Sequence, residues 1–276
     1  MTGLIDIFKE SLPYPIQDIK TLLIFGVFFV VMELSDIFLG WGINLDPSIK
    51  SLLGVLAFIA ALFVLGYFIS VLRQTISGYD GLPEIDFKSN LLDGIQYIIV
   101  AIIYMIIPFI ISIIIAGATG VFSNIFKITT FMSENPDVMQ NATSFTQAVP
   151  QELLNGLVGG LAITAIISAI IFIIFALLLL IAAARLADTG SIKEALMVNK
   201  VIEDISAIGF GRYIGWYIIL IIIFLVFGII VAILSLIPYL GTVIVIMTTV
   251  LFLCIPKNSQ IALRLQILSN MVLSSE

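Results

Sequence analysis

Six long apolar stretches, separated by polar segments, dominate the chain. A helix needs roughly 20 apolar residues to cross the hydrocarbon core of a bilayer. The pattern therefore predicts an all-α membrane protein with six transmembrane helices, forming one polytopic membrane domain over residues 1–276. The expected spans are residues 19–39, 49–72, 95–116, 153–184, 214–237 and 240–255.

The fourth span is unusually long, because residues 153–184 contain no charged side chain. As one helix it would measure about 48 Å, against a hydrocarbon core of about 30 Å. We expect it to tilt, to protrude, or to break near Gly156, Gly159 and Gly160.

Three polar segments alternate apolar and charged positions with helical spacing: residues 4–12, 82–93 and 191–205. Such a pattern predicts amphipathic helices lying in the membrane interface, and short helices packed under the bundle are the alternative. The polar segment 117–151 contains four phenylalanines. We expect it either to lie on the membrane surface or pack as a cap, or to form a solvated linker.

Basic residues predict the orientation of the helices. Ten of the twelve Lys and Arg residues fall in segments on one side of the six spans, and only Lys50 and Lys127 fall on the other. By the positive-inside rule, both termini lie in the cytoplasm and the protein sits in the cell membrane. Segment 117–151 is then outside, and its Asn141-Ala142-Thr143 triplet is a candidate N-glycosylation site.

The composition narrows the function classes. Hydrophobic residues make up 61% of the chain and charged residues 11%, against roughly 45–50% and 25% in soluble domains. The absence of histidine removes the commonest acid–base group and metal ligand, and the single cysteine, Cys254, cannot form an intrachain disulfide. A net charge of −6 argues against nucleic acid as a partner. We expect no catalytic residues, metal or cofactor, and hence no enzyme.

The chain also suggests an internal repeat of amphipathic helix, two spans and an arginine. Arg73, Arg185 and Arg264 each follow an even-numbered span, where an arginine can anchor a helix end at the interface. Three helical hairpins related in this way would be parallel repeats.

Few residues inside the spans could bind an ion, transfer a proton or act as a gate. Glu33 and Asp36 share one helical face, so they are candidates to bind a cation or relay protons, or they mark the outer interface. Tyr104 and Pro108 are candidate gate residues, because a proline within a span frees a carbonyl group, although such prolines are common in membrane helices.

Two pairs of glycines have the G-x-x-x-G spacing that permits close helix packing: Gly156 with Gly160, and Gly211 with Gly215. We expect contacts within one protomer, with a dimer interface as the alternative.

Several motifs together resemble the largely archaeal domain-of-unknown-function family 4013. They include Pro13-Tyr14-Pro15, Gly66-Tyr67, the Leu82-Pro83-Glu84-Ile85-Asp86 stretch, Ala184-Arg185-Leu186-Ala187, and Ile237-Pro238-Tyr239-Leu240-Gly241. The resemblance implies an integral protein of the cytoplasmic membrane and supplies no activity or catalytic residue. The polar segment 117–151 departs from the family pattern.

Three functions stay open. The first is a structural or membrane-organising protein that works through helix packing, interfacial helices and contacts with lipids, with copies of itself or with another membrane protein. The second is a transporter or channel for a small or lipophilic solute. The third is a lipid-handling enzyme, for which the sequence offers the fewest suitable residues.

Overall fold

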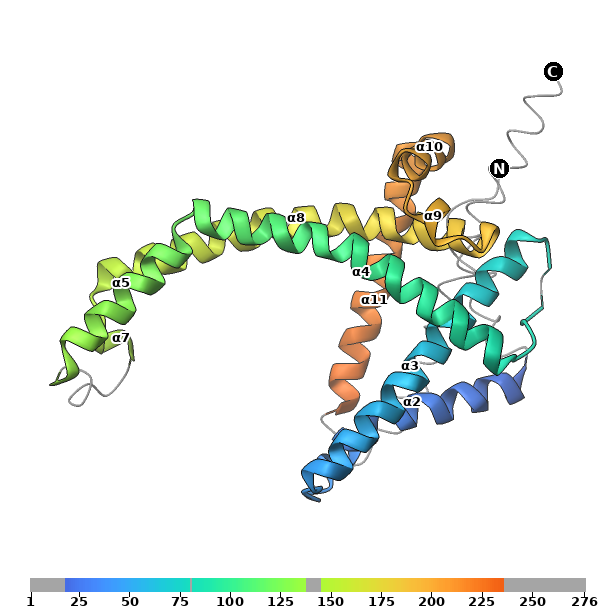
Figure 1. Ribbon diagram of the computed structural model, residues 1–276, viewed down its shortest axis with the longest axis horizontal. Helices are drawn as coiled ribbons and strands as arrows, with labels where there is room; N and C mark the ends of the chain where they lie inside the picture. Colours follow the sequence, from blue (N-terminus) through green and yellow to red (C-terminus); the bar gives the residue numbers. More distant parts are fainter. Residues whose placement is uncertain (1–17, 80, 138–144, 236–276) are drawn as a thin grey trace. The chain divides into compact units, whose positions relative to one another are not determined.

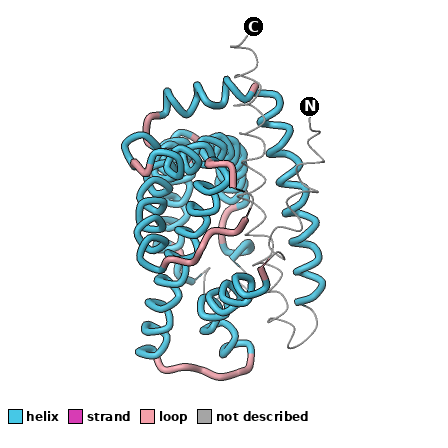
Figure 2. Tube along the Cα trace, turned by 90° about the vertical axis from the view of Figure 1, so that its right-hand side faces the viewer, coloured by secondary structure: helices cyan, strands magenta, loops and turns pink. Residues whose placement is uncertain are grey.

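A computed structural model describes residues 18–79, 81–137 and 145–235, and these residues form helices and loops without a strand (Figures 1 and 2). Five helices in this part of the chain are long and apolar enough to cross a membrane, which indicates a membrane protein, and they coincide with the first five expected spans as far as residue 235. The sixth, residues 240–255, lies outside the described residues. The five helices are α2 (Ile19–Gly40), α3 (Pro47–Ile76), α4 (Phe87–Ala118), α8 (Gln151–Thr189) and α11 (Phe210–Ser235).

Shorter helices lie in the connections between these spans, among them α5 (Val121–Glu134), α7 (Phe145–Ala148), α9 (Ile192–Ala195) and α10 (Val198–Ile208). The chain divides into two compact units. Unit 1 comprises residues 1–100 and 180–276, and unit 2 comprises residues 101–179, so α4 and α8 each contribute to both.

Local sequence explains where the long helices begin and end. Asp18 and Asp46 accept backbone N–H groups at the starts of α2 and α3, as N-cap residues do. After α3 and α8 come Gly78 (φ 93°) and Gly190 (φ 64°), in the left-handed region that terminates helices and that glycine adopts without strain.

The core of unit 1 lies between α2 and α3 and is rich in aromatic rings. Phe25 and Tyr67 have ring centroids 4.5 Å apart, and Phe28 stacks on Phe63 at 4.3 Å. Offset and tilted ring pairs of this kind add to the contribution from burial alone. Leu82, from the segment after α3, packs against the same cluster.

The closest helix contact in unit 1 joins α3 to the start of α4. A Cβ atom built on Gly66 would lie 1.5 Å from the carbonyl oxygen of Asn90, and one on Gly94 would lie 1.9 Å from that of Leu62. The two glycines therefore let the backbones touch, which matters in a bilayer because helix association there depends on close packing.

Unit 2 contains the α4–α8 hairpin and the helix α5 that extends it. Thr119 and Thr164 share a hydrogen bond of 2.7 Å between their hydroxyl groups. Ile128 of α5 is buried in a small cluster with Leu154 of α8. Residues 121–134 thus form a packed helix, and the solvated-linker interpretation is wrong for them, although Phe126 remains 72% exposed.

Two expectations about helices need correction. No separate amphipathic helix forms over residues 82–93, because 82–86 are non-helical and α4 begins at Phe87 and continues to Ala118. The stretch 191–205 forms two helices, α9 and α10, rather than one. The segment 4–12 lies outside the described residues.

Of the three outcomes expected for the fourth span, a break near Gly156, Gly159 and Gly160 does not occur, because α8 is continuous over 39 residues. Two of its glycines are used for packing instead. A Cβ on Gly156 would lie 3.0 Å from the Asn124 side chain, and one on Gly160 would lie 2.9 Å from the Thr119 carbonyl oxygen. A helix of this length measures about 58 Å.

Candidate functional site

Arg73, near the end of α3, ties together three segments of unit 1. Its two terminal nitrogens donate to the two carboxylate oxygens of Asp93 in α4, at 2.8 and 3.1 Å. Its Nε donates to the carbonyl oxygen of Ala187 near the end of α8, at 3.2 Å. A bidentate, charge-assisted pair fixes both distance and orientation, and the Asp93 side chain is only 10% exposed. Arg73 therefore anchors the ends of three helices.

Arg185 makes a similar anchor at the end of α8. It donates to Asp204 of α10 at 2.7 Å, and to a carboxylate oxygen of Glu194 at 3.3 Å. Lys200 donates to the same Glu194 oxygen at 2.7 Å, and this hydrogen bond is the main reason why the pKa of Glu194 lies below its ordinary value. The four side chains form a network that holds α9 and α10 against α8.

The two anchors share a sequence pattern. Arg73 pairs with an aspartate 20 residues further along the chain, and Arg185 with one 19 residues further along. Each arginine also precedes a glycine of positive φ by five residues. This correspondence agrees with the repeat hypothesis for two of its arginines. Arg264 lies outside the described residues, so the threefold repeat stays a prediction.

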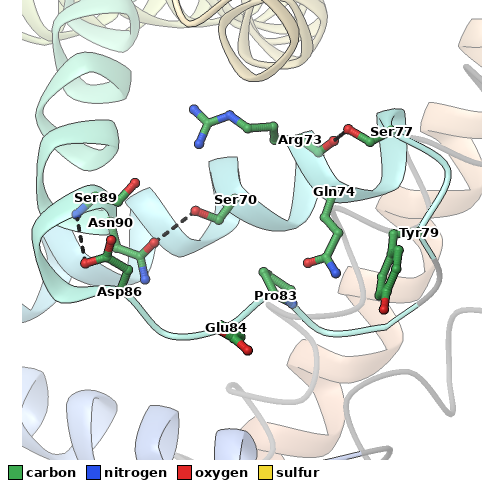
Figure 3. Close-up of a pocket in the computed structure, with 10 residues that line it drawn as sticks. All are labelled: Ser70, Arg73, Gln74, Ser77, Tyr79, Pro83, Glu84, Asp86, Ser89 and Asn90. Atoms are coloured by element: carbon green, nitrogen blue, oxygen red, sulfur yellow. Dashed lines mark hydrogen bonds between the residues drawn. The ribbon is translucent and has the colours of Figure 1, made fainter.

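A pocket of about 410 Å³ lies beside the Arg73 anchor (Figure 3). Its walls come from the last turns of α3, from the segment between α3 and α4, and from the first turn of α4. The lining residues are Ser70, Arg73, Gln74, Ser77, Tyr79, Pro83, Glu84, Asp86, Ser89 and Asn90.

The segment between the two helices is held in place by its own sequence. The Tyr67 hydroxyl donates to the Pro83 carbonyl oxygen at 3.1 Å. Asp86 accepts the backbone N–H groups of Lys88 at 3.0 Å and Ser89 at 3.4 Å and so caps α4. Leu82 and Ile85 pack against the aromatic core. The Leu-Pro-Glu-Ile-Asp motif is thus explained by structure: it forms one wall of the pocket.

Asn90 is the most unusual side chain of the pocket. It is 1% exposed, and its Oδ1 accepts a hydrogen bond of 2.9 Å from the Ser70 hydroxyl. Its Nδ2 has no hydrogen-bond partner among the residues that the structure describes. A buried polar group without a partner costs roughly 1–3 kcal/mol, so Asn90 marks a place where a ligand atom would be stabilising.

The other candidate residues from the sequence are spread over the structure. Glu33 and Asp36 are exposed on α2. In unit 2, Tyr104 and Pro108 are buried on one face of α4, which continues through the proline, and the Ser112 hydroxyl donates to the Pro108 carbonyl oxygen at 2.7 Å. Glu33 and Asp36 belong to unit 1, and Tyr104 and Pro108 belong to unit 2.

The glycines of the second predicted pair lie at the start of α11. A Cβ on Gly211 would meet no atom within 4 Å, in contrast to Gly156 and Gly160. Asn141 lies outside the described residues.

Sequence reasoning missed the pocket and the partners of the arginines. Asn90, Ser70 and Gln74 are ordinary polar residues near helix ends, and nothing in their spacing marks a site. The repeated interval from Arg73 to Asp93 and from Arg185 to Asp204 is the signal that could have revealed both ion pairs.

The chain matches one family model, described as "Protein of unknown function (DUF4013)", over residues 49–236. This region includes α3, α4, both arginine anchors and the whole pocket. No curated protein and no solved structure matches the chain significantly. Because the matched region covers more than half of the sequence, the chain belongs to DUF4013, a family of proteins of unknown function.

Proposed function

We propose that the protein is a structural, membrane-organising protein of the cell membrane, with both termini in the cytoplasm and no enzymatic activity. The observation that carries this proposal is the surface of its long helices. Large aliphatic side chains on α4, α8 and α11 are widely exposed, such as Ile114 at 65%, Ile166 at 64% and Leu225 at 60%. Lipid or another apolar surface must cover them.

The polar groups within the helices support the same role. The hydroxyls of Thr119 and Thr164 bond to each other, and that of Ser112 bonds to a carbonyl of its own helix. Charged partners such as Arg73 and Asp93 are paired where helices end. These polar groups connect parts of the protein, as expected where helix packing is the task.

Cross-linking tests the structural role. A cysteine at Ile166 should form disulfide-linked dimers in native membranes if copies associate through the exposed face of α8. The matched control is a cysteine at the fully buried Val71 of α3, which should stay monomeric. Cys254 is replaced by alanine in both chains. Monomers throughout, with the protein at its native abundance, would contradict association through this face.

Labelling tests the orientation. A cysteine at Lys200, in α10, should be protected from a membrane-impermeant maleimide in intact cells, because the proposal places it in the cytoplasm. A cysteine at Lys127, in α5, should be labelled. The reverse pattern would overturn the orientation while leaving the helical fold unaffected.

Transport of an ion or small solute is the second candidate, favoured by the exposed carboxylates of Glu33 and Asp36 on α2. Ion and proton flux into proteoliposomes measures it directly. Flux that disappears when Glu33→Gln and Asp36→Asn are combined would replace the structural role with transport. Flux equal to that of empty liposomes supports the structural role.

A further inference from the structure

The pocket between α3 and α4 has the character of a binding site. Its volume of about 410 Å³ falls within the range of roughly 300–1,000 Å³ found for small-molecule pockets. Asn90 supplies a buried Nδ2 without an acceptor, from the first turn of α4. The pocket opens where two candidate membrane spans end, α3 at Ile76 and α4 at Phe87.

The charges around the pocket exclude an anionic ligand. Figure 3 shows the Arg73 guanidinium pointing to the side of α3 opposite Gln74, and its nitrogens are engaged with Asp93 and Ala187. The charged groups that remain in the lining are the carboxylates of Glu84 and Asp86. A phosphate or carboxylate placed here would meet these two like charges, and the cation among the described lining residues, Arg73, is already paired with Asp93.

A simple ammonium group fits only part of the lining. It could donate hydrogen bonds to the carboxylates, but it carries no acceptor and would leave Nδ2 of Asn90 unpaired. A hydroxyl group both accepts and donates. It could accept from Asn90 and donate to Asp86, whose Oδ1 caps α4 and whose Oδ2 has no hydrogen bond within the described residues.

The other residues that line the pocket also offer both hydrogen-bond donors and acceptors. Amide and hydroxyl groups of Gln74, Ser77 and Ser89 offer further donors and acceptors, and the Tyr79 ring, 66% exposed, offers an apolar face at one end. We propose that this pocket binds a neutral, hydroxyl-rich group, such as the sugar or polyol headgroup of a membrane lipid. The proposal rests on the membrane location proposed above and is independent of the structural role.

Lipid retention tests the proposal. The full-length protein is reconstituted into phosphatidylcholine nanodiscs containing a small fraction of glucosyl diacylglycerol, re-extracted in mild detergent, and analysed for bound lipid by mass spectrometry. We expect the glucolipid to be enriched over its bulk fraction. Gln74→Ala should reduce this enrichment about tenfold, because a lost hydrogen bond with its partner left unpaired changes affinity by about that factor. Gln96→Ala is the matched control, since Gln96 lies on α4 outside the pocket lining.

A second variant separates a ligand contact from a packing defect. Asn90→Leu removes the unpaired amide and also the acceptor of the Ser70 hydroxyl, so it is combined with Ser70→Ala; the double variant should unfold at about the wild-type temperature while losing glucolipid enrichment, because both partners of the hydrogen bond are removed. Equal glucolipid retention by the wild type, Gln74→Ala and the double variant would overturn the proposal. Preferential retention of an anionic or amino lipid would overturn the assignment of a neutral polyol.

Competition with a free sugar distinguishes a lipid headgroup from a soluble sugar as the source of the hydroxyl groups. If millimolar methyl glucoside displaces the lipid, a free sugar also enters the site, which supports the ligand chemistry. If it does not, the headgroup requires its acyl chains, which supports a lipid ligand. Loss of reconstitution itself would count against the membrane location, so that failure is distinguishable from failure of the pocket proposal.

Discussion

Replacing Gly94 with alanine tests whether the contact between α3 and α4 holds unit 1 together. The new Cβ would lie 1.9 Å from the carbonyl oxygen of Leu62 and 2.8 Å from its carbonyl carbon. Both are backbone atoms, so no side-chain rotation can relieve the overlap. The two helices must instead separate by about 1.5–2 Å to restore an ordinary van der Waals contact.

The free energy lost by that separation has two sources: overpacking at Gly94 and weakening of the ion pair beside it. Overpacking alone costs roughly 1–3 kcal/mol. The shift also stretches the bidentate pair of Arg73 and Asp93, whose shorter hydrogen bond is 2.8 Å, because Asp93 directly precedes Gly94 in α4. Weakening a charge-assisted hydrogen bond adds about 1–2 kcal/mol, at the low end of its range because Arg73 is 39% exposed. We expect a total loss of about 2–5 kcal/mol in the free energy of unfolding.

Unfolding by sodium dodecyl sulfate in mixed micelles, followed by circular dichroism, measures this loss. Gly54→Ala is the matched control: Gly54 lies in α3, and a Cβ there would meet no atom within 4 Å. That variant should be neutral or more stable by up to about 1 kcal/mol, because alanine favours the helix. If Gly94→Ala proved as stable as Gly54→Ala, the close crossing of α3 and α4 would be refuted.

Three further predictions use the same unfolding assay. Arg73→Lys should cost about 1–2 kcal/mol, since lysine cannot make a bidentate contact; an unchanged unfolding curve would show that the anchor contributes nothing. Lys200→Met should flatten the loss of stability on acidification. The Lys200 hydrogen bond lowers the pKa of Glu194, so its stabilising contribution is present above the ordinary carboxyl pKa and is lost as the pH falls below it through the lowered pKa of the folded state. Identical pH profiles for wild type and variant would contradict this. Thr119→Val and Thr164→Val should show a coupling of about 0.6 kcal/mol in a double-mutant cycle, because their hydroxyls share one hydrogen bond; strictly additive effects would argue against that bond.

The spans were predictable because their signal is long and local. A run of apolar residues such as 153–184 satisfies its own backbone only as a helix in lipid, whatever the rest of the chain does. The sequence left open whether the fourth span breaks near Gly156, Gly159 and Gly160, because a glycine in a helix has two uses. The sequence does not say whether it bends the backbone or lets a neighbour such as Asn124 approach.

The site was much less predictable, because it depends on contacts between segments. Leu82 and Ile85 have helical spacing with later apolar residues, yet the Tyr67 hydroxyl and the aromatic core hold this stretch in a non-helical form. Nothing in the sequence around Asn90 indicates a functional residue. Its importance comes from the Ser70 hydroxyl on another helix, which pairs one end of the amide and leaves the other unpaired.

The continuity of α8 has a consequence for the surrounding bilayer. To keep the apolar residues 153–184 within a hydrocarbon layer of about 30 Å, an unbroken helix would have to lean by about 50°, beyond the 0–40° usual for membrane helices. The bilayer around α8 must therefore thicken locally, with the acyl chains of the neighbouring lipids more extended. Lipids with longer acyl chains should suit this protein better than short ones, so it would gather in the thicker regions of the membrane.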